Sequence, residues 1–437
     1  MKIAVIGTGY VGLVSAICFA KLGHDVVGVD KDAGKISALK KNIIPIFEPG
    51  LEEMLLSVIN DKKISFTTDL SQALQGAKAV FIAVGTPQDE DGSADLSYVM
   101  AAAKEIAQNA QDDKVIVTKS TVPVGTGAQI DALLKSTNSK VKFFVASNPE
   151  FLREGNAIED FMQPDRIVIG TKDDEAKKVL TEIYQKFALE KIVNTDITTA
   201  ELIKYASNSF LATKISFINE MADLCEQTGG DIKGLANAVG LDSRIGGKFL
   251  NPGPGFGGSC FPKDIMAIVN VAHKHDVELS LINSVIASNK IRQERMVHKI
   301  VDALGGEVAG KKIAILGLAF KANTDDIRYS PAISIAQKLS KKGALLKLSD
   351  IEAIENSKRE FGANDKVEFF ADAYEATKDA DAIVIATEWK QYGALDFDKI
   401  KQLTKSRIVV DLRNMFDAAK MRQMGFNYIY IGGKKHD

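Results

Sequence analysis

Short apolar runs alternate with amphipathic segments in the first part of the chain. Residues 3–6, 26–29, 80–84, 115–118, 143–146 and 167–169 are rich in β-branched side chains and do not alternate with polar ones. Such runs are typical of strands in a parallel sheet that is covered on both faces. The amphipathic segments between them predict helices, as in repeated βαβ units. We therefore predict a doubly wound, Rossmann-like α/β domain over residues 1–198.

The rest of the chain changes pattern twice. A long helix is predicted to begin near residue 199, and helical periodicity continues to about residue 304, interrupted by a Gly/Pro-rich loop at 251–262. Residues 313–316, 345–348, 382–386 and 408–410 are again strand-like runs. We expect two Rossmann-like doubly wound α/β domains, at 1–198 and 305–437, joined by a long central helix within a helical region at 199–304. Such a region often supplies a dimer surface.

Composition narrows the class of protein. The chain has 437 residues, 46% of them hydrophobic, and a formal net charge of −2, which provides no overall field to attract nucleic acid or an anionic membrane. The three cysteines, Cys18, Cys225 and Cys260, are far apart and form no CxxC pair, so neither a disulfide framework nor a metal site is indicated. A strand that starts at Lys2 leaves no room for a signal peptide, and no apolar run reaches the roughly 20 residues of a membrane helix. We expect a soluble cytoplasmic protein.

A dinucleotide site is predicted at the first strand end. Gly7, Gly9 and Gly12 form a G-x-G-x-x-G sequence between a strand and a helix. These glycines allow a tight turn, close approach of the backbone to a pyrophosphate, and helix–strand packing. Asp30 ends the second strand, 18 residues past Gly12, where its carboxylate can accept from ribose hydroxyls and repel a 2′-phosphate. The pattern favours NAD over NADP; a glycine turn without a ligand is the alternative.

Other predicted strands also stop in polar residues. Residues 85–87, 118–121 and 148–150 follow three of them. Ligands in open parallel sheets bind outside the carboxyl ends of strands, so these ends indicate one crevice. The alternative is that they are helix caps and turns.

Cys260 lies in the Gly/Pro-rich loop, just before a predicted helix whose first turn holds Pro262. A helix N-terminus and the nearby Lys263 would both lower the pKa of the thiol and favour the thiolate. Cys18 and Cys225 lie within apolar helical patterns and fit small buried residues. We therefore predict that Cys260 is a nucleophile.

Two further groups carry possible chemistry. Lys204 and Asn208 are one turn apart on an otherwise apolar helix face, and an inward lysine is costly unless it is paired or used. Glu150 and Glu154 follow a strand end, where one could activate water. The alternatives are a snorkelling lysine and a solvated charged turn. Together these residues suggest an alcohol oxidised to an aldehyde, trapped by Cys260 as a thiohemiacetal, oxidised again to a thioester, and hydrolysed. Lys204 and Asn208 would stabilise the oxyanion.

Three segments carry a family resemblance: 148–155 (NPEFLREG), 201–208 (ELIKYASN) and 255–264 (GFGGSCFPKD). They resemble UDP-glucose 6-dehydrogenases of the UDP-glucose/GDP-mannose dehydrogenase family, and the similarity covers essentially the whole chain. It implies oxidation of UDP-glucose to UDP-glucuronate with two NAD and one water, in a homodimer, without a metal.

The resemblance also implies roles for individual residues. For catalysis it implies Cys260 as nucleophile, Glu150 as hydrolytic base, Lys204, Asn208 and Asp264 for the proton and the oxyanion, and Thr118 in support. The positions that match NAD contacts are Gly7, Gly9, Val11, Gly12, Asp30, Lys35, Thr86, Thr121, Glu154, Lys263 and Arg328. Those that match sugar-nucleotide contacts are Glu150, Phe151, Leu152, Arg153, Glu154, Lys204, Asn208, Phe249, Leu250, Asn251, Pro252, Gly253, Gly257 and Lys321. Arg244 resembles an arginine that reaches a neighbouring subunit's site.

The second α/β part supports a nucleotide role on its own. Gly317 to Lys321 occupy the fingerprint position but contain one glycine, which suits UDP better than a dinucleotide. Two nucleotide-holding lobes would place the sugar carbon that reacts at their junction, with Cys260. A GDP-mannose 6-dehydrogenase, or an enzyme for another NDP-sugar, stays open, because no base-reading residue is visible. A one-step hydroxy-acid dehydrogenase would not need Cys260, and an NAD-sensing protein without turnover would not need Cys260, Lys204 and Glu150.

Overall fold

The computed structural model describes residues 1–89 and 92–433. They divide into two compact units: residues 1–207 with 266–278, and residues 208–265 with the described part of 279–437. Two of the three divisions fall inside helices, α9 (Ile197–Thr228) and α11 (Phe261–Lys274), and the third falls just before α12 (Ser280–Ala303). The last four residues of the predicted 305–437 domain lie outside the described residues.

The sheet of the first unit has the order β3-β2-β1-β4-β5-β6-β7-β8. Its strands are β1 (Lys2–Ile6), β2 (Asp25–Val29), β3 (Ile64–Thr67), β4 (Ala79–Ile82), β5 (Lys114–Thr118), β6 (Phe143–Ser147), β7 (Ile167–Gly170) and β8 (Ile192–Thr195). Neighbours pair in parallel except β6 and β7, which meet in one antiparallel bridge between Ser147 and Gly170. The strand order reverses direction between β1 and β4, which makes this the switch point where ligands bind.

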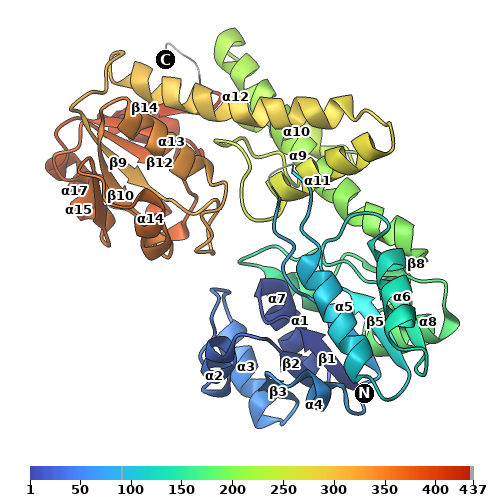
Figure 1. Cartoon of the computed structure of the whole chain (residues 1–437). Helices are drawn as coiled ribbons and strands as arrows, with labels where there is room; N and C mark the ends of the chain where they lie inside the picture. The colour runs from blue at the N-terminus through green and yellow to red at the C-terminus, as the bar shows by residue number, and fades with distance from the viewer. Residues whose placement is uncertain (90–91, 434–437) are drawn as a thin grey trace. The chain divides into compact units, whose positions relative to one another are not determined.

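Helices cover both faces of this sheet (Figure 1). Along β1, Ile3 and Val5 pack in one core and Ala4 and Ile6 in another, as strand geometry requires. The first core contains α1 (Tyr10–Lys21), α3 (Leu51–Asn60), α7 (Ala157–Met162) and α8 (Asp174–Ile183). The second contains α4 (Leu70–Leu74), α5 (Ser97–Asn109) and α6 (Thr126–Thr137). Helix α2 (Ala33–Lys40) adds Ile36 and Leu39 to the first core, and a 3₁₀ turn lies at Leu189–Lys191.

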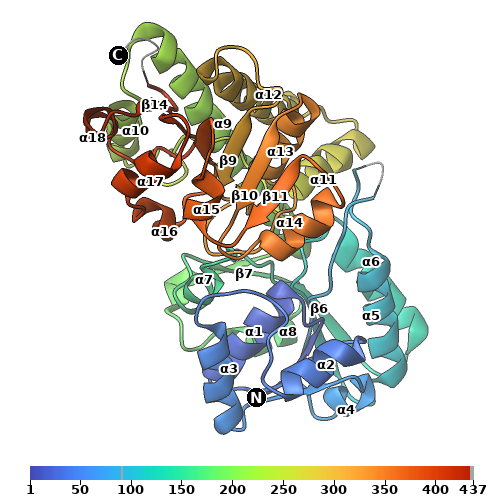
Figure 2. The ribbon, with the colours of Figure 1, turned by 90° about the vertical axis from the view of Figure 1, so that its left-hand side faces the viewer.

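The second unit has a parallel sheet of order β11-β10-β9-β12-β13-β14. The strands are β9 (Lys312–Leu316), β10 (Leu345–Ser349), β11 (Val367–Phe370), β12 (Ala382–Ile385), β13 (Ile408–Asp411) and β14 (Asn427–Tyr430), and the first three lie side by side in Figure 2. Their helices are α13 (Pro331–Lys341), α14 (Ile354–Phe361), α15 (Ala373–Thr377), α16 (Lys390–Gly393), α17 (Phe397–Leu403) and α18 (Ala418–Gln423). The C-terminal part of α9, with α10 (Ile232–Leu241) and α12 (Ser280–Ala303), belongs to the same unit.

Sequence patterns predicted the inner strands and missed the outer ones. The missed strands β3, β8, β11 and β14 are the edges of the two sheets. Each has exposed or half-buried positions, whereas β4 and β12 are buried throughout. Edge strands therefore lack the continuous apolar run by which a buried parallel strand is detected.

The predicted fold class is confirmed. Both sheets have Rossmann-like topology, and α9 is the long central helix. In the described part of the chain, no helix is long and apolar enough to cross a membrane.

Candidate active site

The glycine turn after β1 has the geometry that a pyrophosphate needs. Gly7 has φ +96°, and a Cβ on Gly12 would lie 1.9 Å from the carbonyl oxygen of Gly7, so neither position tolerates a side chain. A Cβ on Gly9 would meet nothing within 4 Å, so its backbone faces open space. Gly9 caps α1, and Val11 is in the first turn of that helix. The turn therefore leaves room for an anion at a helix N-terminus.

Asp30 is held at the edge of this turn. Its Oδ2 accepts from the backbone N–H and from the hydroxyl of Thr8, both at 2.8 Å, and its Oδ1 accepts from the N–H of Asp32. Burial opposes the charged carboxylate, but these hydrogen bonds and the nearby Lys35 outweigh it, so the pKa of Asp30 lies below its ordinary value. Asp30 is half-buried and ionised, which fits an acceptor for ribose hydroxyls.

The second unit also has a glycine turn after its first strand and an acid after the next one, but this acid is not free to bind a ribose. Gly317 has φ +101°, and Asp350, at the end of β10, accepts from the N–H groups of Leu318 and Ala319. Asp350 is 1% exposed, and its other oxygen accepts from Glu352 and Ala353. The carboxylate is used by these backbone groups and by the indole N–H of Trp389, so this turn lacks the free acceptor that Asp30 provides.

The polar strand ends of the first unit lie together. The Thr86 hydroxyl donates to the carbonyl of Thr121 at 2.9 Å, and the N–H of Asn148 donates to the carbonyl of Thr118. Thr118 is 1% exposed, and its hydroxyl has no hydrogen-bond partner among the described residues. Lys119, which belongs to the predicted polar strand end 118–121 but has no predicted role of its own, donates to the Asn148 side chain at 3.0 Å. Burial lowers the pKa of Lys119 to about 8, although the charge of Glu150 acts in the opposite direction.

Glu150 and Lys204 form a buried ion pair in the first unit. Lys204 Nζ donates to Glu150 Oε1 at 2.8 Å, and the side chains are 4% and 3% exposed. The other oxygen of Glu150 accepts from the N–H of Leu152 at 2.6 Å. Phe151 packs beneath two cations, with Arg166 at 3.8 Å and Lys204 at 5.7 Å from its ring centroid. The inward lysine predicted from the helix pattern is therefore paired with the predicted base.

A second buried polar group belongs to the second unit. Asn208, one turn after Lys204 on α9, donates to Asp264 Oδ2 at 2.7 Å, and Lys263 pairs with Asp264 Oδ1 at 2.6 Å. Asp264 is fully buried. The charge of Lys263 is thus shared with Asp264, although the sequence suggested Lys263 mainly as a neighbour of the thiol.

Cys260 directly precedes α11, as predicted, and its carbonyl accepts the N–H of Asp264 at 2.8 Å. It is half-buried, whereas Cys18 and Cys225 are buried. Burial raises the pKa of the Cys18 thiol to about 12, and burial also raises that of Cys225. Cys260 alone among the cysteines combines access with a helix N-terminus, the setting that favours a thiolate.

The predicted sugar-nucleotide segment lines a pocket of about 530 Å³ within the second unit. Leu250, Asn251, Pro252 and Arg413 are among its lining residues. Arg413 donates to the carbonyls of Phe320 and Ala386, which follow β9 and β12, the switch point of this sheet. Sequence reasoning missed Arg413, although the polar residues after the β13 run were a usable signal.

Other predicted residues are held by their neighbours. Arg153 pairs with Asp160, Arg244 with Asp242 and Arg328 with Asp326. Lys321 lies 5.3 Å from the ring centroid of Phe320, and Glu154 is half-buried beside Gly155. Phe249 has φ +66°, and a Cβ on Gly257 would lie 2.3 Å from the carbonyl oxygen of Tyr329. Phe249 therefore adopts a left-handed backbone conformation that is unusual for its residue type, and only glycine fits at position 257.

The contact between Tyr10 and Glu48 was also not predicted from the sequence. Glu48 is 7% exposed and accepts from the N–H groups of Gly155 and Ala157 and from the Tyr10 hydroxyl. Tyr10 follows the glycine turn, so this contact ties the turn to the segment after Glu150. Only a tertiary contact between residues 107 positions apart reveals it.

Comparison with known proteins places the chain. It matches three family models of UDP-glucose/GDP-mannose dehydrogenases: the NAD binding domain over residues 1–188, the central domain over 198–291 and the UDP binding domain over 314–418. A UDP-glucose 6-dehydrogenase of Rhizobium meliloti is 52% identical over 99% of both chains. A solved UDP-glucose dehydrogenase of Pyrobaculum islandicum superposes with a TM-score of 0.90 at 39% identity, covering 98% of this chain and 96% of that one. For a GDP-mannose dehydrogenase of Pseudomonas aeruginosa the TM-score is 0.54 at 30% identity, with 98% and 99% covered.

The fold and the site thus define an NAD-dependent oxidoreductase with a second nucleotide-binding domain. The chain belongs to the UDP-glucose/GDP-mannose dehydrogenase family. The predicted family, the NAD cofactor and a UDP-sugar ligand are confirmed at this level.

Proposed function

We propose that this protein is a UDP-glucose 6-dehydrogenase. The reaction is UDP-glucose + 2 NAD⁺ + H₂O → UDP-glucuronate + 2 NADH + 3 H⁺. The observation that carries the proposal is the accessible thiol of Cys260 at the start of α11, next to the buried Asn208–Asp264–Lys263 group. The 52% sequence identity with the Rhizobium meliloti enzyme, over 99% of both chains, supports UDP-glucose as the substrate.

The residues of the dinucleotide turn fit NAD. We assign its pyrophosphate to Gly7, Gly9, Val11 and Gly12 and its ribose to Asp30. Further contacts are assigned to Lys35, Thr86, Thr121, Glu154, Lys263 and Arg328. When bound, NAD accepts one hydride in each half of the reaction.

Cys260 makes the second oxidation possible. An aldehyde has no hydroxyl proton to give up, whereas addition of the Cys260 thiolate to its carbon produces an alkoxide that can expel a hydride. The product of that step is a thioester on Cys260. Lys204 and Asn208 donate to the oxyanion, which is worth about 10²–10³ in rate per donor, and Asp264 accepts the alcohol proton through a water.

Glu150 then acts as the hydrolytic base. It removes a proton from a water that attacks the thioester, which releases the uronate and the Cys260 thiolate. Before this step, Lys204 holds the Glu150 carboxylate in place and pairs with its charge. Thr118 supports this end of the site from β5.

The UDP portion is assigned to the pocket of the second unit. Arg413 provides a guanidinium for the diphosphate, and Leu250, Asn251 and Pro252 also line this pocket. The remaining sugar-nucleotide contacts are assigned to Phe151, Leu152, Arg153, Phe249, Gly253, Gly257 and Lys321. In this scheme residues 1–198 bind NAD, 199–304 carry the Cys260 loop, and 305–437 bind UDP.

We also propose a homodimer. Phe210, Phe217 and Leu224 follow one another at seven-residue spacing on α9 and are 65%, 46% and 53% exposed. Such a stripe is typical of a helix that packs against a second copy. Arg244, whose side chain is 87% exposed, would enter the site of the neighbouring subunit. The cytoplasm is the proposed compartment, because a catalytic thiol must stay reduced.

Mixing two inactive variants tests the shared site. If Arg244 serves the neighbouring subunit, Cys260→Ala and Arg244→Ala subunits form hybrids with one complete site. Since half of randomly mixed dimers are hybrids, about a quarter of the wild-type activity should return. No gain over the Arg244→Ala protein alone would contradict this role.

A substrate screen tests the main proposal. UDP-glucose, GDP-mannose and other UDP- and GDP-sugars are each supplied with NAD while NADH absorbance is followed. We expect kcat/KM for UDP-glucose to exceed that for GDP-mannose by at least ~100-fold. A preference for GDP-mannose would replace the proposal with the alternative that the sequence left open.

A further inference from the structure

The loop that joins the sugar-nucleotide segment to Cys260 has little structure of its own. Gly253, Gly255, Gly257 and Gly258 lie within it, and Gly255 and Gly258 have φ of +120° and +86°. Glycines give the unfolded loop many conformations, so fixing it is costly in entropy. Its position must therefore come from neighbouring elements.

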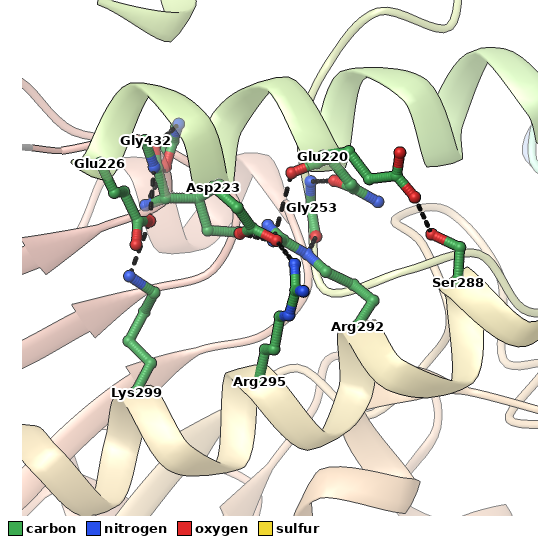
Figure 3. Close-up of polar contacts among 12 residues, drawn as sticks. Glu220, Asp223, Glu226, Gly253, Ser288, Arg292, Arg295, Lys299 and Gly432 are labelled. Carbon is green, nitrogen blue, oxygen red and sulfur yellow. Dashed lines mark hydrogen bonds and ion pairs between the residues drawn. The ribbon is translucent and has the colours of Figure 1, made fainter. Parts of the chain in front are cut away.

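Two side chains hold the peptide groups of Gly253. Asn219 Oδ1, on α9, accepts the Gly253 N–H at 2.8 Å, and Arg292 Nε, on α12, donates to the Gly253 carbonyl at 2.9 Å. Both side chains belong to residues that are 3% exposed. Figure 3 shows Gly253 between the two helices, with Arg292 reaching up to it from α12.

A third side chain holds Phe256 in the same way. Asn289 Oδ1 accepts the Phe256 N–H at 2.9 Å, and Asn289 Nδ2 donates to the Phe256 carbonyl at 3.0 Å. A Cβ on Gly255 would lie 2.7 Å from Asn289 Oδ1, so the glycine is what allows this approach. Asn289 and Arg292 are three residues apart on α12 and face the loop together.

The buried charge of Arg292 is costly for a residue that only fills space. Its Nη1 pairs with Asp223, but its Nη2 has no hydrogen-bond partner among the described residues. Asp223 also pairs with Arg295, whose side chain is 53% exposed (Figure 3). An apolar side chain of similar size would avoid this desolvation, so the guanidinium is better explained by what it holds.

We propose that Asn219, Asn289 and Arg292 are positioning residues, which fix the 251–260 loop so that the sugar-nucleotide segment and the Cys260 thiol are held in register. The inference rests on the proposed function for its kinetic readout. The proposal predicts that the two ligands respond differently when the loop is loosened. Loosening the loop should impair the Cys260 thiol and UDP-glucose binding, whereas NAD binding at the glycine turn of the first unit should be unchanged.

Variants at Asn219 separate positioning from bulk. Asn219→Leu keeps the size and removes the acceptor, while Asn219→Asp keeps the acceptor. We expect Asn219→Leu to lower kcat and the rate of Cys260 alkylation by iodoacetamide at least about tenfold, with KM for NAD within twofold of wild type. Asn219→Asp should stay within about threefold of wild type. Asn289→Asp loses the donor to the Phe256 carbonyl and tests the same idea at a second position. Arg295→Ala is the matched control, and its kcat should be unchanged.

The outcomes are distinct. The proposal is overturned if Asn219→Leu and Asn289→Asp fold with wild-type thermal midpoints and keep wild-type kcat and alkylation rate. It is also overturned if Asn219→Asp loses as much as Asn219→Leu, or if KM for NAD rises in parallel. Alkylation of Cys260, located by peptide mass, needs no substrate. A wrong substrate assignment would therefore abolish wild-type turnover and leave the alkylation comparison intact.

Discussion

Lys204 Nζ donates to Glu150 Oε1 at 2.8 Å although the two residues are 54 positions apart in the chain. The pair joins α9 to the segment after β6, and both side chains are almost fully buried. Breaking a buried ion pair by removing one partner typically costs about 3–5 kcal/mol, so a conservative substitution is needed to study the chemistry. The pair places the proposed hydrolytic base and an oxyanion donor side by side.

Glu150→Gln should arrest the reaction at the thioester. The amide keeps a hydrogen-bond acceptor for Lys204 but cannot take a proton from water, so hydrolysis should slow by about 10²–10⁴. Mass spectrometry of the intact protein mixed with UDP-glucose and NAD should then detect a covalent adduct on Cys260. Glu159→Gln, an exposed position on α7 with no assigned role, is the control. A slow Glu150→Gln enzyme without an adduct would assign the base elsewhere.

Asp30→Asn should reduce the preference of the enzyme for NAD over NADP. The amide can still accept hydrogen bonds but no longer carries the charge that three donors stabilise. Since a hydrogen bond to a charged group is worth about 1.5–3 kcal/mol, we expect KM for NAD to rise about tenfold or more. KM for NADP should fall, because the repulsion of its 2′-phosphate is lost. Steady-state kinetics with both cofactors measure this; an unaltered NAD preference would show that Asp30 does not set it.

The buried Lys119 predicts a pH dependence of stability. Its pKa is about 8 in the folded protein and near the ordinary 10.5 when unfolded. Between these values the unfolded chain holds the proton and the folded chain does not, so the Lys119 contribution to folding stability rises with pH. Relative to Lys119→Met, the wild type should gain up to about 3 kcal/mol from pH 7.5 to 10.5. Urea denaturation of both proteins across this range measures the difference, and a constant or shrinking difference would contradict the lowered pKa.

Much of the fold could be predicted because parallel sheets bury their inner strands. β1, β4 and β9 are continuous apolar runs, and the runs reveal them. The edge strand β8 has two exposed positions out of four, so its pattern does not differ from that of a loop. Where burial is partial, the sequence signal is too weak to mark a strand.

The site residues that could be predicted are those marked by a local sequence pattern. Cys260 is marked by its loop and the helix that follows, and Lys204 by its place on an apolar helix face. Arg292 is invisible in this way, since its partner Gly253 is 39 positions distant and no periodicity links them. Tertiary hydrogen bonds of this kind leave no spacing in the sequence, so only the structure identifies them.

The central claim is that Cys260 makes a second hydride loss possible, and the ratio of NADH formed to UDP-glucose consumed tests it most directly. Limiting UDP-glucose is driven to completion with excess NAD, and NADH and UDP-glucuronate are quantified, with Cys260→Ala as the comparison. The account predicts two NADH per UDP-glucose for the wild type, and no uronate from Cys260→Ala despite normal NAD binding. One NADH per sugar nucleotide in the wild type, or uronate formed without the thiol, would contradict it.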